Sequence, residues 1–368
     1  GQGRVYAFLH ATNDVLTARG VELPLPPQAT VATRPGDGRN ADRPHSVALP
    51  MTQQQSMSAQ TYSSFGDDAV LQLQERPLPE VGPGEVLVRV RTAGINPVDW
   101  KIMSGGLSSL MHTEFPVVPG WDVAGVVAAT GIDTPGFSEG DEVIAYNRRD
   151  WIHHGTFAEY TTVPARALAP KPAALDWDQA GGLPLAGLTA LQVLTRLGLS
   201  RDPQENRGTT VLIHGASGGV GSMGVQIAAA YGARVIGTAS RSNHGWLREL
   251  GAEPVEYGEG LTQRVRDLAP AGVQIVADFV GGVVETTTAV LAEGGAHASI
   301  ADPQVLEHGG QWLWVHPDAE GLAELGRLAE DGALTVRVAD TFPLDRLPEA
   351  FAASREGHTA GKLVLRVS

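Results

Sequence analysis

A glycine-rich turn between an apolar strand and a helix constrains the fold of this chain more than any other feature of its sequence. Residues 209–240 read TTVLIHGASGGVGSMGVQIAAAYGARVIGTAS, which predicts a buried strand, a tight turn, an Ala-rich helix and a second strand. Glycines let the backbone turn sharply and approach a pyrophosphate closely, while the following helix directs free N–H groups at the anion. The alternative is a strand-to-helix turn that holds no ligand. We expect a dinucleotide to be bound by Gly215, Ser217, Gly218, Gly219, Val220 and Gly221.

The end of the second strand predicts which dinucleotide binds. Proteins that bind NAD place an Asp or Glu here to hold the ribose hydroxyls, but this chain reads Thr-Ala-Ser-Arg-Ser-Asn over residues 238–243. A carboxylate would repel a 2′-phosphate, whereas the hydroxyl of Ser240 and the guanidinium of Arg241 would bind one. The sequence therefore favours NADPH over NADH. Alternatively, Arg241 is a solvated residue at the start of a helix.

The chain divides into segments of different character, and together they predict an α/β protein. Residues 57–186 read as short strands of alternating polar and apolar residues separated by Pro-Gly turns, which is typical of a barrel-like β unit. Strands alternate with helices over residues 187–335, which predicts βαβ units and a parallel sheet. Residues 336–368 return to a β pattern, and we expect them to complete the first unit. Residues 1–56, rich in Pro, Arg, Asp and Gly, are expected to be a disordered or appended leader, or else an arm that docks on a neighbouring subunit.

Charge and cysteine content exclude several classes of function. The chain has 27 Lys and Arg against 41 Asp and Glu, and its net charge of −14 disfavours binding to nucleic acid. It has no cysteine, which excludes disulfides, thiolate nucleophiles, iron–sulfur clusters and Cys-ligated zinc. No apolar run reaches the roughly 20 residues that a membrane-spanning helix needs, and no secretory signal is visible. We expect a cytoplasmic protein without a membrane partner.

Short motifs follow one another in a characteristic order along residues 57–368. Besides the glycine-rich turn they are AGINPVDWKIMSG (93–105), PVVPGWDVAGVV (116–127), GDEVIAY (140–146), GTFAEY (155–160), GGLPLAGLTAL (181–191), DFVGG (278–282) and AGKLVLRV (360–367). Together they resemble the zinc-independent branch of the medium-chain dehydrogenase/reductase superfamily, the quinone oxidoreductase (zeta-crystallin-like) group. The resemblance implies a GroES-like β-rich catalytic domain and a Rossmann domain with a doubly wound parallel sheet. It also implies NADPH bound in a cleft between the domains, and a homodimer.

The resemblance assigns roles to individual residues through their positions in these motifs. Asn96 and Asp99 would line the nicotinamide end of the cleft, and Tyr146 would lie near the substrate, the three forming the expected catalytic set. Asp99 could instead cap a helix, and Tyr146 could be a buried core aromatic. Further cofactor contacts are implied for Thr189, for Tyr257 at the 2′-phosphate, and for Val280 and Gly281 at the nicotinamide ribose. Tryptophans that could either shape an apolar pocket or pack in the core are Trp121, Trp312 and Trp314.

Departures from the neighbouring zinc-dependent alcohol dehydrogenases indicate chemistry without a metal. Those enzymes carry Cys where this chain has Asn96, and Gly-His-Glu where it has Gly-Trp-Asp over residues 120–122. The spacing of His112, His153 and His154 matches no standard zinc site. We therefore expect no bound metal.

Without a Lewis acid, hydride transfer is easiest to an acceptor that conjugation has already activated. We expect NADPH-dependent reduction of a small-molecule quinone or α,β-unsaturated carbonyl. One alternative is a 2-enoyl thioester reductase, although the chain has no Lys/Arg cluster to hold a CoA-like phosphate. The other is a non-catalytic protein that binds or senses NADPH.

Overall fold

The computed structural model describes residues 56–357 and 359–368 of the chain. Its first strand begins at Ser56, so the expected leader or docking arm lies outside the described residues except for that one position. The described chain is organised around two large sheets. They define a β-rich lobe, residues 56–182 and 338–368, and a parallel-sheet lobe, residues 183–337. The expected boundaries at 186/187 and 335/336 stay a prediction.

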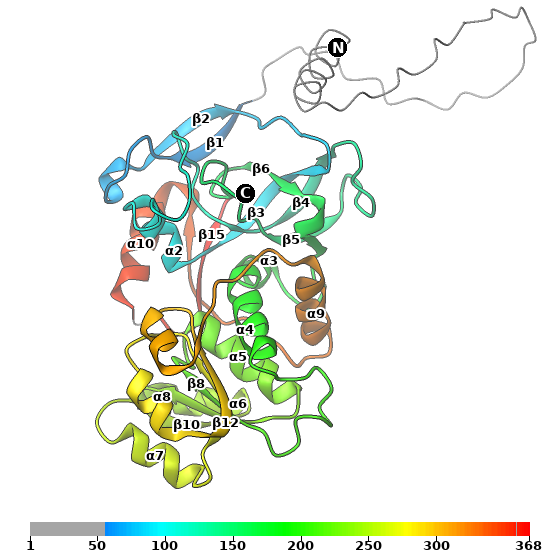
Figure 1. Ribbon diagram of the computed structural model, residues 1–368. Coiled ribbons are helices and arrows are strands. Elements are labelled where there is room, and N and C mark those ends of the chain that lie inside the picture. The colour runs from blue at the N-terminus through cyan, green and yellow to red at the C-terminus, as the bar shows by residue number, and fades with distance from the viewer. Residues whose placement is uncertain (1–55, 358) are drawn as a thin grey trace, which may run out of the picture. The chain divides into compact units, whose positions relative to one another are not determined.

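The β-rich lobe contains a seven-stranded sheet with the strand order β14-β15-β3-β4-β5-β7, in which β6 also pairs with β3. A separate two-stranded sheet joins β1 to β2. In Figure 1, β15, in red near the C-terminus, lies beside β3, in blue, and the two strands are antiparallel. The strands of this lobe are β1 (Ser56–Thr61), β2 (Gln72–Pro77), β3 (Glu85–Ile95), β4 (Asp122–Thr130), β5 (Glu142–Tyr146), β6 (Tyr160–Pro164), β7 (Leu168–Pro170), β14 (Val338–Pro343) and β15 (Lys362–Arg366).

Three helices accompany these strands, namely α2 (Pro97–Met103), α3 (Trp177–Gly182) and α10 (Leu347–Glu356). Helix α2 begins directly after β3, because Asn96 and Asp99 form a capping box and Pro97 fills the first helical position, where no N–H is needed. Helix α3 begins with the equivalent pair Asp176 and Gln179.

The parallel-sheet lobe contains six strands in the order β10-β9-β8-β11-β12-β13, all parallel. The chain builds outward from β8 to β10 and then from β11 to β13, so the strand order reverses between β8 and β11, where doubly wound sheets bind ligands. The doubly wound parallel sheet expected from the sequence is confirmed. Its strands are β8 (Thr210–His214), β9 (Arg234–Ala239), β10 (Ala252–Glu256), β11 (Val273–Asp278), β12 (Leu291–Ser299) and β13 (Gln311–Trp312).

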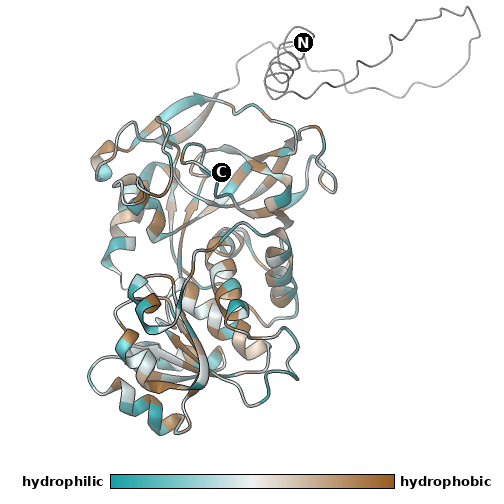
Figure 2. Ribbon diagram, in the orientation of Figure 1, coloured by the Kyte–Doolittle hydropathy of each residue, from teal (hydrophilic) through white to brown (hydrophobic). Residues whose placement is uncertain are grey.

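Helices cover both faces of this sheet. Successive side chains of a strand point to opposite faces, and here the side chains on both faces are apolar. In β8, Val211 and Ile213 belong to the large core that includes residues of α4 and α5, whereas Leu212 packs in a second core with residues of α7 and α8. Figure 2 shows both teal and brown residues along α7, whose buried residues are Leu261 and Val265. The helices of this lobe are α4 (Pro184–Arg196), α5 (Gly219–Ala230), α6 (His244–Glu249), α7 (Leu261–Leu268), α8 (Val284–Val290) and α9 (Ala319–Glu330).

Candidate active site

The glycine-rich turn lies at the carboxyl end of β8 and has the shape that a pyrophosphate requires. Gly215 has a φ of +69°, a left-handed conformation that favours glycine. A Cβ on Gly221 would lie 2.1 Å from the carbonyl oxygen of Gly215, so the turn closes only around glycine. Gly218 caps α5 in an extended conformation, which leaves the first N–H groups of the helix directed out of its N-terminus. This cradle fits the phosphates of a dinucleotide.

The start of β15 docks on the same turn. The N–H of Gly361 donates to the carbonyl oxygen of Ser217 at 3.2 Å, and Gly361 forms a parallel bridge with Gly218. A Cβ on Gly219 would lie 2.8 Å from Cδ of Lys362. The β-rich lobe therefore contacts the phosphate-binding turn directly through Gly361 and Lys362.

The residues that follow β9 are partly or fully exposed, as a site for the adenosine end of a dinucleotide must be. The Ser240 hydroxyl lies 3.0 Å from the hydroxyl of Ser242, and the side chain of Arg241 is 82% exposed. Nε of Arg241 donates to the Glu256 carboxylate at 2.8 Å. Tyr257 follows Glu256 and is also exposed. The structure thus places Ser240 and Arg241 close to Glu256, an acid at the end of the next strand that the sequence analysis missed.

The DFVGG motif (278–282) lies at the carboxyl end of β11, next to the place where the strand order of the sheet reverses between β8 and β11. Asp278 accepts hydrogen bonds from the N–H groups of Val280 and Gly281, both at 2.9 Å, and from the hydroxyl of Ser299 at 2.7 Å. A Cβ on Gly215 would lie 3.3 Å from Cβ of Val280. The predicted contacts at Val280 and Gly281 are therefore held beside the glycine-rich turn.

In the β-rich lobe, Asn96 lies at the centre of a buried polar network. Its amide nitrogen donates to Asp122 at 2.9 Å, and its amide oxygen accepts from the Lys362 ammonium at 2.6 Å. Its backbone N–H donates to Asp99 at 2.7 Å. The other carboxylate oxygen of Asp122 accepts from the N–H of Leu185, and the Lys362 ammonium lies 3.9 Å from Asp122. Lys362 therefore sets the orientation of the Asn96 amide, and Asp99 caps α2, as the alternative interpretation of this residue proposed.

Burial shifts the protonation of this network. It raises the pKa of Asp99 to about 8, and the charge of Asp122 adds to the shift. It raises the pKa of Asp122 to about 6 against the opposing effect of Lys362, whose own pKa burial lowers. Near neutral pH, Asp99 therefore keeps its proton, while Asp122 and Lys362 form the charged pair.

The raised pKa of Asp99 predicts a specific pH dependence of stability. Its folded value of about 8 lies above the unfolded value of about 3.9, so the stabilisation is complete below pH 4 and is lost as the pH rises through 8. One such proton contributes a slope of roughly 1.4 kcal/mol per pH unit between these values. Asp99→Asn removes this contribution. The urea midpoint should therefore fall less between pH 5.5 and pH 8 in the variant than in the wild-type protein.

The matched control is Asp150→Asn, because Asp150 is an exposed aspartate on the same lobe. It should retain the full wild-type difference between the two pH values. An equal difference in wild type and in Asp99→Asn would show that Asp99 is ionised in the folded protein.

Tyr146 lies at the carboxyl end of β5, where its register partner on β4 is Asp122. It is fully buried, and its ring packs edge-to-face on Trp121 with centroids 6.0 Å apart. Burial raises its pKa, so the hydroxyl stays protonated at physiological pH. That hydroxyl makes no hydrogen bond of normal geometry within the described residues, although the Trp314 side chain lies near enough to offset part of the raised pKa. The geometry fits a core aromatic with an unused donor, and the predicted catalytic role of Tyr146 stays a prediction.

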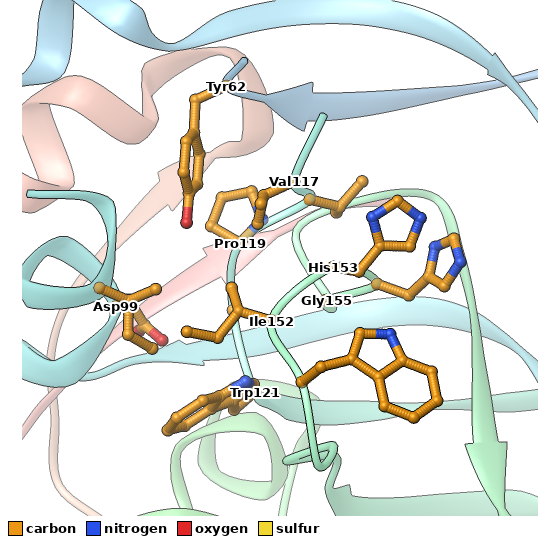
Figure 3. Close-up of a pocket in the computed structure, with 13 residues that line it drawn as sticks. Tyr62, Asp99, Val117, Pro119, Trp121, Ile152, His153 and Gly155 are labelled. Atoms are coloured by element: carbon orange, nitrogen blue, oxygen red, sulfur yellow. The ribbon is translucent and has the colours of Figure 1, made fainter. Parts of the chain in front are cut away.

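A small cavity of about 10 Å³ is lined by Tyr62, Asp99 and eleven further residues of the β-rich lobe. The Tyr62 hydroxyl and one carboxyl oxygen of Asp99 are buried and lack partners among the described residues. In Figure 3 the Tyr62 hydroxyl points down toward the side on which Asp99 lies. A cavity of this size has room for about one water molecule.

A larger cavity of about 300 Å³ lies between α4 and residues 313–318. Thr189 of the predicted cofactor contacts lines it, although the Thr189 hydroxyl donates to the carbonyl oxygen of Leu185 at 2.7 Å. Trp314 also lines this cavity, and it and Trp312 are partly exposed. These two tryptophans are therefore available to a ligand, whereas Trp121 is buried.

The positions that hold zinc in the alcohol dehydrogenases do not fit a metal ion in this chain. The Asn96 amide is occupied by Asp122 and Lys362, and Asp122 already has the Lys362 ammonium beside it. Within residues 56–357 and 359–368, no three His, Cys, Asp or Glu side chains gather in a group that could bind a metal. In the same part of the chain, no helix has the length and apolar character needed to cross a membrane.

Two family descriptions match separate parts of the chain. Residues 82–173 match the alcohol dehydrogenase GroES-like domain, and residues 250–365 match the zinc-binding dehydrogenase family. The first match falls in the β-rich lobe, and the second covers most of the parallel sheet and extends into β15.

Whole-length relatives share both lobes. The chain is 34% identical to a chloroplastic NADPH-dependent alkenal/one oxidoreductase of Arabidopsis thaliana, over 84% of this chain and 79% of the relative. The structure of the quinone oxidoreductase from Coxiella burnetii is 31% identical, with a TM-score of 0.73 over 85% of this chain and all of that one. A mycobacterial protein solved in complex with NADPH is 30% identical, with a TM-score of 0.71 and the same coverage.

Proposed function

Because this chain belongs to the medium-chain dehydrogenase/reductase superfamily, together with quinone oxidoreductases and alkenal reductases, we propose that it transfers hydride from NADPH to a quinone or α,β-unsaturated carbonyl without zinc. The family expected from the motifs is confirmed, and the chain is an oxidoreductase. The choice of NADPH, of the acceptor and of a zinc-free route is the proposal. The activities named for the alkenal/one and quinone relatives support it.

One observation carries the proposal most directly. Lys362 touches the glycine-rich turn with its side-chain carbons and the Asn96 network with its ammonium. The dinucleotide cradle and the position that holds zinc in other branches therefore meet at one residue, and a lysine ammonium stands there in place of a metal. Such a site can position a dinucleotide, but it has no Lewis acid for an isolated carbonyl.

In this mechanism the chain supplies binding, orientation and protons. NADPH, when bound, would supply the hydride. The N-terminus of α5 and the turn ending in Gly221 would hold the pyrophosphate, and Val280 and Gly281 would limit the position of the nicotinamide ribose. The protonated Tyr146 hydroxyl is the candidate donor to the acceptor oxygen as negative charge develops there.

The preference for NADPH depends on Arg241 leaving Glu256 for the 2′-phosphate. We expect Arg241→Ala to weaken NADPH binding by about tenfold, the value of one charge-assisted hydrogen bond, with little change for NADH. Glu256→Gln removes the competing carboxylate and should tighten NADPH binding. Calorimetric titration of both cofactors measures these effects. An equal change for NADPH and NADH in Arg241→Ala would place the 2′-phosphate elsewhere.

Assembly and location are also proposals. We propose a homodimer, supported by the exposed side chain of Trp312 on β13, one of the two edge strands of the parallel sheet. Light scattering should report the mass of two chains, and the mass of one chain would overturn this. A cytoplasmic location remains our working assignment. The Arabidopsis relative is chloroplastic by name, so fractionation of the source cells is the test.

The activity itself is tested by following the absorbance of NADPH, and separately of NADH, with a naphthoquinone or a 2-alkenal. We expect NADPH to be consumed faster than NADH with at least one acceptor, and the faster acceptor identifies the substrate class. Tight NADPH binding without turnover on either acceptor would instead favour a binding or sensing protein.

A further inference from the structure

Arg337, the last residue before β14, lies beside the glycine-rich turn. Its carbonyl oxygen accepts from the N–H of Lys362 at 2.8 Å, and a Cβ on Gly361 would lie 3.1 Å from its Cγ. Gly361 in turn donates its N–H to the carbonyl oxygen of Ser217 in the turn. The side chain of Arg337 therefore begins next to the backbone of Gly361, which separates it from the turn.

The guanidinium of Arg337 lies over the ring of Trp246, with its carbon 4.5 Å from the ring centroid. Trp246 belongs to α6, which begins directly after the short helical turn of residues 241–243 at the end of β9. An aromatic face attracts the cation without accepting its N–H groups in hydrogen bonds of their own plane. Those N–H groups point outward in that plane and stay available to an anion. The ring thus fixes where the cation lies.

The glycine-rich turn and the end of β9 are bonded to each other. The N–H of Ala216 donates to the carbonyl oxygen of Thr238 at 3.0 Å, and the N–H of Gly215 donates to the Thr238 hydroxyl at 3.1 Å. In sheets that bind dinucleotides, the turn holds the pyrophosphate and the end of the second strand faces the adenosine ribose. Because Arg337 extends from Gly361 at the turn to α6 beyond β9, its cation lies at the adenosine end of the proposed site.

The two arginines near this end differ in their partners. Arg241 donates to Glu256 at 2.8 Å, whereas Arg337 is exposed and forms no ion pair with any described residue. Other exposed arginines in that part of the chain, such as Arg248, also lack an ion pair, so the position of Arg337 carries the argument. A phosphate that binds Arg337 does not have to displace a carboxylate first, and it keeps the full gain of a charge-assisted contact.

We propose that Arg337 binds the 2′-phosphate of the cofactor and is a second determinant of the preference for NADPH. The inference deepens the proposed function and rests on it for the identity of the dinucleotide. The planar guanidinium, held on Trp246, presents its N–H groups to two oxygens of the phosphate. Arg241, from the segment after β9, adds a second cation once Glu256 releases it.

Two ligands without a nicotinamide test the proposal in the absence of turnover. Calorimetry compares 2′-phospho-ADP-ribose with ADP-ribose, which differ only in the 2′-phosphate, in wild type, Arg337→Met, Arg337→Lys and Arg248→Met. The phosphorylated ligand should bind wild type more tightly and lose about tenfold in Arg337→Met, as one charge-assisted contact predicts. ADP-ribose should change less than about threefold, and Arg337→Lys should recover part of the loss because the charge remains.

Arg248→Met is the matched control, because Arg248 is an exposed arginine in the last turn of the same helix that carries Trp246. Its replacement should leave the binding of both ligands unchanged. Retained affinity for ADP-ribose in Arg337→Met also shows that this variant is folded. Equal affinity of wild type and Arg337→Met for the phosphorylated ligand overturns the proposal. An equal loss for both ligands also overturns it, because it would place Arg337 at the pyrophosphate.

Turnover separates this proposal from the proposed function. With an acceptor that wild type reduces, Arg337→Met should raise the KM for NADPH about tenfold and leave kcat and the kinetics with NADH little changed. If wild type oxidises neither cofactor with a quinone or a 2-alkenal while the difference in ligand binding persists, the proposed reaction fails and the phosphate site stands. If wild type oxidises NADPH and Arg337→Met changes neither KM nor ligand binding, the phosphate site fails and the proposed reaction stands.

Discussion

Gly221→Ala is expected to abolish tight NADPH binding, with a loss of affinity of about a hundredfold or more, equivalent to about 2.7 kcal/mol. The added Cβ would lie 2.1 Å from the carbonyl oxygen of Gly215 and 2.8 Å from the Cα of Ala216. Both contacts are with backbone, so no side-chain rotation relieves them and the turn must open. Because the turn positions the pyrophosphate against the N-terminus of α5, opening it removes the main contacts of the cofactor. Titration of NADPH by fluorescence or calorimetry measures the loss.

Gly245→Ala is the matched control, because a Cβ on Gly245, which is also helical, meets nothing within 4 Å. It should leave NADPH binding unchanged and raise stability slightly, as alanine does in a helix. The circular dichroism of Gly221→Ala should remain close to that of wild type. Wild-type affinity for NADPH in a folded Gly221→Ala protein would show that the cofactor binds away from this turn.

Lys362→Met is expected to cost about 3–5 kcal/mol of stability, because it leaves Asp122 as a buried charge without its partner. The ammonium it removes donates to the Asn96 amide at 2.6 Å and lies 3.9 Å from Asp122. The pKa of Asp122 should then rise further, and the Asn96 amide should lose its fixed orientation. Urea denaturation at pH 7 measures the stability, and steady-state kinetics measures the accompanying fall in kcat.

The double variant Lys362→Met/Asp122→Asn provides the test of this explanation. An asparagine at position 122 retains an oxygen for the N–H of Leu185 but carries no charge. The double variant should therefore lose less stability than the sum of the losses in the two single variants, by about 1 kcal/mol or more. Simple additivity would mean that Lys362 stabilises the protein through packing on Gly219 rather than through the charge of Asp122.

Features that depend on neighbouring residues in the sequence could be predicted well. The glycine-rich turn, the strand before it and the helix after it lie within one short stretch, and the structure places all of them where the pattern predicts. The parallel sheet follows from the alternation of apolar strands and helices. In each case the residues that determine the structure are close in the sequence, so the pattern can be seen in a single stretch.

Features that depend on contacts between distant segments could not be predicted. Asp122 and Lys362 meet only because β15 returns to the sheet beside β3. Both lie in motifs quoted for the family, and a signal was present in each: a charged residue followed directly by a run of apolar residues and glycine, as in DVAGVV and KLVL. The motifs alone did not indicate that these two charges are buried together, and their role beside Asn96 was missed.

The cofactor end shows the same limit. The absence of an acid at the end of β9 was visible in the sequence, but Glu256 reaches Arg241 from the end of β10 because the two strands are parallel neighbours. Similarly, Tyr146 could be placed at the end of a strand from its motif, whereas its complete burial against Trp121 depends on how two segments pack. A position in a motif thus predicted neighbours along the chain and not the partners that each side chain meets.

The most direct measurement of the central claim follows deuterium from NADPH labelled at C4 of the nicotinamide into a 2-alkenal. Each face of the ring is labelled in turn, and the product is examined by mass spectrometry. Direct hydride transfer to a conjugated acceptor predicts a saturated aldehyde that carries one deuterium on its β-carbon from one of the two labelled cofactors. Deuterium on the carbonyl carbon of an allylic alcohol, or a reduced product without deuterium from either cofactor, would contradict it.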